Sequence, residues 1–279
     1  MAASLAGKIG RKVLIVLGSV ALGWILAMVV VSTQQVRIIF PAPPGNGHAP
    51  GRGKVLRLPS PAGEIAAVHF EGPPGSRTAI FFHGNGEEMV DGEDWAVELQ
   101  RAGLGVLLVE YPGYGLTKSL GPPSEEKCYL AAETALTYLR ETLGVPVERT
   151  ILSGHSLGSA VAAEMALRGR GARLVLLSPL SSTADVGKDW LWYLPVDLLV
   201  RHRFETLKKA PRIHVPTLVV HGKRDQVAPV WMGERIAKAL PNVQLVVLES
   251  ANHDLIWPRL NPLAVCVAAF ADGKACELR

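Results

Sequence analysis

Residues 150–168 read TILSGHSLGSAVAAEMALR and contain the pattern G-x-S-x-G at 154–158. The apolar run Thr150–Ser153 predicts a buried strand that ends at the first glycine, and the alanine-rich run Leu157–Arg168 predicts a helix directly after it. A reversal this sharp imposes unusual backbone angles on the residue at its apex, so only small residues fit on either side. The sequence therefore predicts a strand–turn–helix unit with Ser156 at the apex.

A serine in this position can act as a nucleophile, because the turn projects its hydroxyl above the carboxyl end of the sheet. The helix that begins at Leu157 points its N-terminal amides, with their partial positive charge, toward the same place. The backbone N–H of Leu157 is therefore a candidate donor to a developing oxyanion. The alternative is a glycine-rich turn with an idle serine, and the strand before Ser156 and the helix after it argue against that alternative.

The rest of the chain alternates short apolar runs with longer amphipathic segments, which predicts an α/β fold with a doubly wound, mostly parallel sheet. The predicted strands are Ile65–Phe70, Thr78–Phe82, Val106–Val109, Thr150–Ser153, Leu174–Leu177, Thr217–Val220 and Gln244–Leu248. The predicted helices are Glu93–Ala102, Ser124–Thr142, Leu157–Arg168 and Met232–Ala239.

A nucleophilic serine needs an imidazole to remove its proton and a carboxylate to orient that imidazole. Asp225 follows the predicted strand that ends at Val220, and His253 follows the strand that ends at Leu248. Both loops leave the carboxyl ends of strands, where open α/β sheets bind their ligands. We therefore expect Asp225 to be the orienting acid and His253 the base.

Several other acids compete with Asp225 for this role. Asp185 and Asp197 precede the last two strands, and Glu249 and Asp254 lie too close to His253 along the chain to serve it. Among the remaining histidines, we expect His83 and His221 to be structural and His155 to fill a variable position of the turn. His48, His69, His202 and His214 belong to no motif.

An oxyanion site needs a second backbone donor beside Leu157. The loop after Phe82 reads His83-Gly84-Asn85-Gly86-Glu87, and its small residues allow the backbone to approach a substrate. The N–H of Asn85 is our candidate for the second donor, and an ordinary glycine turn is the alternative. This chemistry needs no cofactor or metal ion. The three cysteines, Cys128, Cys266 and Cys276, have no metal-ligand spacing, and we expect free thiols, although Cys266 and Cys276 could pair in an oxidising compartment.

The N-terminus has the pattern of a membrane anchor. Residues 1–12 are basic, and Val13 to Val31 is an uncharged apolar stretch of the length that crosses a bilayer. Residues 32–53 are expected to form a linker, and 54–279 the catalytic domain. More basic residues precede the stretch than follow it, which places the N-terminus in the cytoplasm and the catalytic domain outside it. The alternative is a secreted protein whose signal peptide is cleaved.

The net charge of +4 resides entirely in residues 1–40, which contain four basic residues and no acid. The excess positive charge therefore comes from the residues that flank the membrane segment, and we expect no nucleic-acid partner. Composition and motifs leave the oligomeric state open.

Across residues 35–270 the chain resembles the α/β-hydrolase-domain proteins, in the branch with a single N-terminal membrane helix. The matching motifs are HGNG at 83–86, EYPGYG at 110–115, GHSLG at 154–158, HGKRDQVAP at 221–229 and NHD at 252–254. This resemblance implies a lid around 183–210 and a hydrolase for esters or thioesters, with lysophospholipid lipases and protein depalmitoylases among the relatives. Lys118 departs from the small residue usual near that position, and Asn252 departs from the usual context of the base.

The residues and the resemblance together predict a serine hydrolase that cleaves a carboxylic ester or thioester through an acyl-enzyme on Ser156. The aromatic run Trp190-Leu191-Trp192-Tyr193 in the lid suits a lipid or other acyl substrate, although it would equally serve to pack the lid onto the core. Two alternatives remain open: an aminopeptidase-like peptidase or acyltransferase on the same fold, and a membrane-tethered binding protein without catalytic activity.

Overall fold

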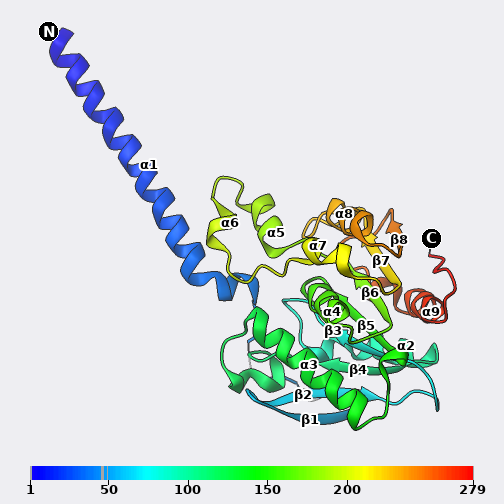
Figure 1. Ribbon diagram of the computed structural model, residues 1–279. Helices are drawn as coiled ribbons and strands as arrows, with labels where there is room; N and C mark the ends of the chain where they lie inside the picture. Colours follow the sequence, from blue (N-terminus) through cyan, green and yellow to red (C-terminus); the bar gives the residue numbers. More distant parts are fainter. Residues whose placement is uncertain (1, 45–46, 49, 279) are drawn as a thin grey trace.

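The computed structural model describes residues 2–44, 47–48 and 50–278, and it has an eight-stranded sheet at its centre (Figure 1). The strands are β1 Lys54–Ser60, β2 Gly63–Phe70, β3 Thr78–Phe82, β4 Gly105–Val109, β5 Thr150–His155, β6 Arg173–Leu177, β7 Thr217–Gly222 and β8 Val243–Leu248. Their order in the sheet is β1-β2-β4-β3-β5-β6-β7-β8. Only β2 runs against its neighbours, so the carboxyl ends of β3 to β8 meet at one edge.

Helices cover both faces of the sheet and enclose two apolar cores. On one face lie α3 (Glu125–Glu141), α4 (Leu157–Leu167) and α8 (Trp231–Ala239). On the other lie α2 (Glu93–Arg101) and α9 (Leu260–Ala271). Short 3-10 helices span Met89–Gly92, Gly115–Leu120, Val147–Arg149, Ala210–Arg212 and Trp257–Arg259. The predicted α/β architecture is thus confirmed, with β3 to β7 buried on both faces as their apolar runs indicated, whereas β8 at the sheet edge is partly exposed.

Among the strands and the helices that cover the sheet, two elements were missing from the prediction. Strand β1 buries only Leu56 and Leu58 on alternate positions, because it lies at the sheet edge with one face in solvent. Its period of two therefore differs from the continuous apolar runs of the inner strands. Helix α9 contains Pro262, which is tolerated because it lies in the first turn, where the backbone N–H has no intrahelical acceptor.

Helix α1 (Ala2–Ile39) is long and apolar enough to cross a membrane, and most of it extends away from the domain (Figure 1). The helix extends beyond the predicted membrane segment 13–31 and includes residues 32–39, which were assigned to the linker. The helix continues because its last turns pack on the domain, where the side chain of Gln35 is buried and Phe40 joins the core. Of the predicted basic segment and linker, residues 1, 45–46 and 49 lie outside the described residues.

Between β6 and β7 lie three short helices, α5 (Thr183–Trp190), α6 (Val196–Leu199) and α7 (Thr206–Lys209), in the segment predicted to be the lid. In Figure 1, α5 and α6 lie between the lower part of α1 and the rest of the domain. The expectation of free thiols near the C-terminus was also wrong, since Cys266 of α9 forms a disulfide with Cys276. Cys128 is free and buried in α3.

Candidate active site

Ser156 stands at the predicted turn between β5 and α4. Its φ of 50° and ψ of −117° lie in a region that residues other than glycine rarely adopt, at a cost of about 1–3 kcal/mol. The N–H of Ser156 donates to the carbonyl of Leu177 on the neighbouring strand β6, at 2.9 Å, which helps to hold this conformation. Backbone strain of this kind is concentrated at functional sites.

The two flanking glycines are required by the close approach of backbones around the turn. A Cβ at Gly154 would collide with the carbonyl of Gly158, and a Cβ at Gly158 would collide with the carbonyl of Phe82 at the end of β3. Both collisions are with backbone atoms, which cannot rotate away as a side chain can. The sequence-based expectation that only small residues fit here agrees with this geometry.

The structure brings the three predicted catalytic residues into one hydrogen-bonded chain. The Ser156 Oγ lies 2.9 Å from His253 Nε2, and His253 Nδ1 lies 2.8 Å from Asp225 Oδ2. The Ser156 and Asp225 residues are buried, whereas the His253 side chain is 14% exposed. The imidazole can therefore accept the hydroxyl proton on one nitrogen while the carboxylate fixes the proton on the other.

The carboxylate of Asp225 is held in place from both of its oxygens. Its Oδ1 accepts hydrogen bonds from the N–H groups of Val227 and Ala228, each at 2.9 Å, and its Oδ2 also lies 3.2 Å from His221 Nε2. Burial raises the pKa of this carboxyl, but the hydrogen bonds from His221 and His253 outweigh burial and hold the pKa well below its usual range. Asp225 is thus an ionised, oriented acceptor.

The competing acids have other partners. Asp185 and Asp197 lie in the lid, where both pair with Lys188. Glu249 is exposed and pairs with Lys223. The spatial arrangement therefore agrees with the choice of Asp225 by chain order.

The two proposed oxyanion donors both lie at the pocket that contains Ser156. Leu157 is the first residue of α4, so its N–H has no carbonyl one turn earlier within the helix. Asn85 is fixed on two sides: its carbonyl accepts from the Tyr114 hydroxyl at 2.8 Å, and its side-chain amide donates to the carbonyl of Ile39 in α1 at 3.3 Å. The second bond links this loop to the N-terminal helix.

A buried histidine that pairs with a partly buried glutamate beside the catalytic groups was not recognised from the sequence. His155 was expected to fill a variable position, but its Nδ1 lies 2.8 Å from Glu87 Oε1 and its Nε2 lies 3.1 Å from the carbonyl oxygen of His253. The other oxygen of Glu87 accepts from Gly84 N–H at 2.8 Å. The pair therefore links the loop of Asn85 to the loop of the base. The only signal in the sequence was that Glu87 and His155 are large polar residues in or beside motifs that otherwise consist mainly of small residues.

Both nitrogens of His155 face acceptors, which favours the doubly protonated imidazolium. Burial lowers the pKa of His155, but the charge of Glu87 and its hydrogen bond outweigh burial and raise it above 6.5. Burial would raise the pKa of Glu87, but the same pairing lowers it from 4.5 to about 2. The Glu87 contribution to stability is thus present above pH 4.5 and lost as the pH falls toward 2. The His155 contribution is present below pH 6.5 and lost as the pH rises through its raised pKa.

We therefore expect Glu87→Gln to destabilise the protein most between about pH 4.5 and 6.5, by roughly 1–3 kcal/mol, the cost of leaving a buried polar partner unsatisfied. Denaturant unfolding of both proteins at a series of pH values checks this. Glu249→Gln, which removes an exposed ion pair with Lys223, is the matched control. Its destabilisation should not peak between about pH 4.5 and 6.5. A difference between wild type and Glu87→Gln that stays constant from pH 3 to pH 8 would contradict the paired charges.

A second histidine–carboxylate pair supports the same loop. His83 Nδ1 lies 2.7 Å from the carbonyl of Gly84, and its Nε2 lies 3.0 Å from Glu110 Oε1. Burial lowers the pKa of His83, but the hydrogen bond and charge of Glu110 outweigh it and raise the pKa. His221 is also buried, with Nε2 2.7 Å from the carbonyl of Ala228. The structural roles expected for His83 and His221 agree with these contacts.

A cavity of about 470 Å³ opens beside Ser156, and apolar side chains make up most of its wall. The wall has three sources: the core around the catalytic turn, the lid, and the last turns of α1. Its residues are Val31, Gln35, Ile38, Ile39, Asn85, Ser156, Leu157, Leu180, Thr183, Val186, Gly187, Trp190, Leu191, Val196, Val200, Val227 and Ala228. The size and apolar character suit an acyl chain.

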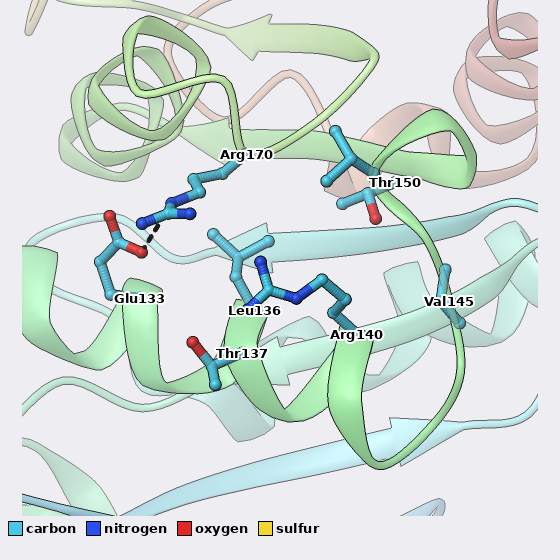
Figure 2. Close-up of a pocket in the computed structure, with 8 residues that line it drawn as sticks. Glu133, Leu136, Thr137, Arg140, Val145, Thr150 and Arg170 are labelled. Carbon is cyan, nitrogen blue, oxygen red and sulfur yellow. Dashed lines mark ion pairs between the residues drawn. The ribbon is translucent and has the colours of Figure 1, made fainter.

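A second hollow lies between α3 and the amino end of β5, where Arg170 pairs with Glu133 and Thr150 forms part of the wall (Figure 2). Its volume of about 10 Å³ is at the limit for a single water molecule. It lies at the end of β5 opposite to Ser156. This hollow is therefore too small to be a substrate site.

Comparison with known proteins agrees with the fold. The family described as "Alpha/beta hydrolase family" matches residues 79–212, and that described as "TAP-like protein" matches residues 188–270. An uncharacterized protein of Mycobacterium tuberculosis is 31% identical over 237 residues, which cover 80% of this chain and 81% of that protein. The alpha/beta hydrolase domain-containing protein aho-3 of Caenorhabditis elegans is 32% identical over 182 residues, covering 63% of this chain and 52% of that protein.

Among solved structures, the Pyrococcus furiosus esterase Pf2001 superposes with a TM-score of 0.65 at 18% identity, covering 83% of this chain and 96% of the esterase. At this identity the likeness shows the fold. The two family matches, which together span residues 79–270, show that the chain belongs to the α/β-hydrolase family. Family membership supports a hydrolase activity.

Proposed function

We propose that the protein is a serine hydrolase that cleaves a carboxylic ester or thioester of an acyl substrate through an acyl-enzyme on Ser156. The observation that carries the proposal is the hydrogen-bonded chain from Ser156 through His253 to Asp225 at the wall of a large apolar cavity. A strained serine beside a base, with an oriented carboxylate behind the base, is the arrangement that nucleophilic acyl transfer requires.

The proposed reaction has two halves. First, His253 Nε2 takes the proton of the Ser156 hydroxyl as Oγ bonds to the carbonyl carbon, and the N–H groups of Asn85 and Leu157 stabilise the oxyanion. The intermediate collapses, and His253 gives its proton to the departing alcohol or thiol. In the second half, His253 activates a water molecule that attacks the acyl-enzyme, and the carboxylic acid leaves as Ser156 regains its proton. Asp225 remains ionised and orients the imidazole throughout.

A panel of acyl esters, acyl thioesters and aminoacyl amides, assayed with the full-length protein in detergent, tests the reaction type. We expect hydrolysis of the esters or thioesters, with kcat/KM rising as the acyl chain lengthens, because the cavity wall is apolar. Preferential cleavage of the aminoacyl amides would favour the aminopeptidase-like alternative. Transfer of the acyl group to an added alcohol in preference to water would favour an acyltransferase, and no turnover of any substrate would favour a binding protein.

We further propose that α1 is retained as a single membrane anchor, with its N-terminus in the cytoplasm and the catalytic domain outside it. Retention is supported by Val31 in the cavity wall and by Trp24, whose indole N–H donates to the carbonyl of Tyr193 in the lid, because cleavage at the end of the apolar stretch would remove both. The orientation is supported by the basic residues that precede the apolar stretch. The Cys266–Cys276 disulfide is also consistent with an oxidising compartment.

Protease added to intact cells that express the protein with a C-terminal tag tests this orientation. We expect the tag to be lost while the membranes remain sealed, because the domain is outside. A tag that survives until the membranes are opened would place the domain in the cytoplasm. A tag recovered in the medium without protease would show that the segment is cleaved and the domain secreted.

A further inference from the structure

The N-terminal helix takes part in the active site, in addition to its proposed role as an anchor. Val31, Gln35 and Ile38 of α1 line the same cavity as Ser156. Gln35 is buried, and its side chain bridges to the lid: its Oε1 accepts from Arg201 N–H at 2.8 Å, while its amide donates to the carbonyl of Leu199 at 3.5 Å. The cavity is therefore closed on one side by the part of α1 that directly follows the apolar stretch.

The lid contacts α1 at a second level, further from the catalytic domain. The indole N–H of Trp24 donates to the carbonyl of Tyr193 at 2.8 Å. Between the two levels, Ala27, Met28 and Val31 of α1 pack against an apolar cluster of the lid that contains Leu194 and Val196. We use the term lid tip for residues 190–198, which lie along this part of α1.

The positions of these contacts along α1 determine how deep the lid tip lies relative to a membrane. With a rise of about 1.5 Å per residue, the apolar stretch 13–31 is roughly 28 Å long, close to the hydrocarbon thickness of a bilayer. Trp24 lies seven residues before Val31, and therefore about 10 Å inside the end of that stretch. A lid tip that is bonded to Trp24 must accordingly lie beside the membrane-embedded part of the helix.

The exposed side chains of the lid tip match this environment. Trp192 is 83% exposed and Leu198 is 85% exposed. Tyr193 and Trp190 are also exposed, and tryptophan and tyrosine concentrate at membrane interfaces. Asp197 is the one acidic side chain within the lid tip, where it pairs with Lys188 and Arg203, and Asp189 directly precedes the tip. An apolar surface of this kind that adjoins a membrane helix is typical of insertion into one leaflet.

We propose that the lid tip inserts into the leaflet beside α1, and that the cavity takes a long acyl chain directly from that leaflet. The occupant of the lid-tip surface is thus the lipid bilayer, and the substrate class is an ester or thioester whose acyl chain is already in the membrane. This proposal rests on the proposed hydrolase function for its substrate and on the α1–lid contacts for its membrane part.

The insertion can be measured without any catalysis. Trp192→Cys in a Ser156→Ala background is labelled with an NBD fluorophore and reconstituted, as the full chain, in phosphatidylcholine vesicles. Cys128 is buried and the other two cysteines form a disulfide, so the introduced thiol is the accessible one among the described residues. We expect blue-shifted emission that nitroxide-labelled lipids quench. Val265→Cys, on an exposed position of α9, is the control and should not be quenched. Equal behaviour of the two probes would overturn the insertion.

The delivery of substrate is tested by the double variant Trp192→Asp with Leu198→Asp, whose side chains do not line the cavity. We expect a loss of about tenfold or more in hydrolysis of a long-chain ester embedded in vesicles, and an unchanged rate on a short, water-soluble ester, because charge at the lid tip opposes insertion. Val265→Asp should change neither rate. An equal loss on both esters, or no loss on either, would overturn the proposal. If the wild type hydrolyses neither ester, the hydrolase function fails, and the fluorescence experiment still decides the insertion.

Discussion

Ser156→Ala is expected to lower kcat/KM for ester hydrolysis on the order of 10⁵- to 10⁶-fold, because the attacking oxygen is removed and the remaining groups of a triad act only as a unit. The residual rate would come from the oxyanion donors and from substrate binding. Initial-rate kinetics with a chromogenic short-chain ester measures this loss. A Ser156→Ala protein that keeps a tenth or more of the activity would show that another group is the nucleophile.

Two comparisons separate lost chemistry from lost structure. Ser76→Ala removes a hydroxyl before β3, at the opposite end of the sheet, and should leave the rate unchanged. Ser156→Gly should be equally inactive and yet more stable than Ser156→Ala, because glycine adopts the positive φ of this position without the side-chain strain. Thermal unfolding of both variants measures their stability. If Ser156→Ala is unfolded, its loss of activity reflects lost structure and not the lost hydroxyl.

Asp225→Asn is expected to lower kcat by about 10³- to 10⁴-fold with little change in KM. The Oδ1 of residue 225 would still accept the N–H groups of Val227 and Ala228, so the amide nitrogen would take the place of Oδ2, opposite His253 Nδ1. The imidazole would then carry its proton on Nε2, where it cannot accept the proton of Ser156. The same ester assay measures the loss.

The matched control is Asp254→Asn, which removes an exposed carboxylate adjacent in sequence to the base. We expect it to alter kcat less than threefold, since single surface charges contribute little. If Asp254→Asn abolished activity while Asp225→Asn did not, the acid would have been assigned to the wrong loop, despite the hydrogen bond between Asp225 and His253.

The site could be predicted because its residues follow strand ends. In a parallel sheet the carboxyl ends of strands meet at one edge, so Ser156 after β5, Asp225 after β7 and His253 after β8 are brought together by topology alone. The turn at Ser156 was recognisable for a related reason. Its glycines are required by backbone contacts between β5 and α4 and between α4 and Phe82, and such contacts arise where a strand turns this sharply into a helix.

Other features depend on contacts that no local pattern records. The Glu87–His155 pair joins residues 68 positions apart, and the Trp24–Tyr193 contact joins residues 169 positions apart. The extension of α1 to Ile39 follows from packing of its last turns on the lid and the core, whereas hydropathy marks only the apolar stretch. The disulfide depends on how α9 ends, because the helix and the chain after it bring the Cα atoms of Cys266 and Cys276 to 4.6 Å.

The central claim is that Ser156 is the nucleophile of an acyl-transfer reaction, and covalent labelling tests it most directly. The full-length protein is treated with a fluorophosphonate probe, digested, and analysed by mass spectrometry. The geometry around Ser156 and His253 predicts a single adduct on Ser156, and no adduct in Ser156→Ala or, at the same probe concentration, in His253→Ala. Labelling of a different residue, or no serine-dependent labelling of the wild type, would contradict the claim.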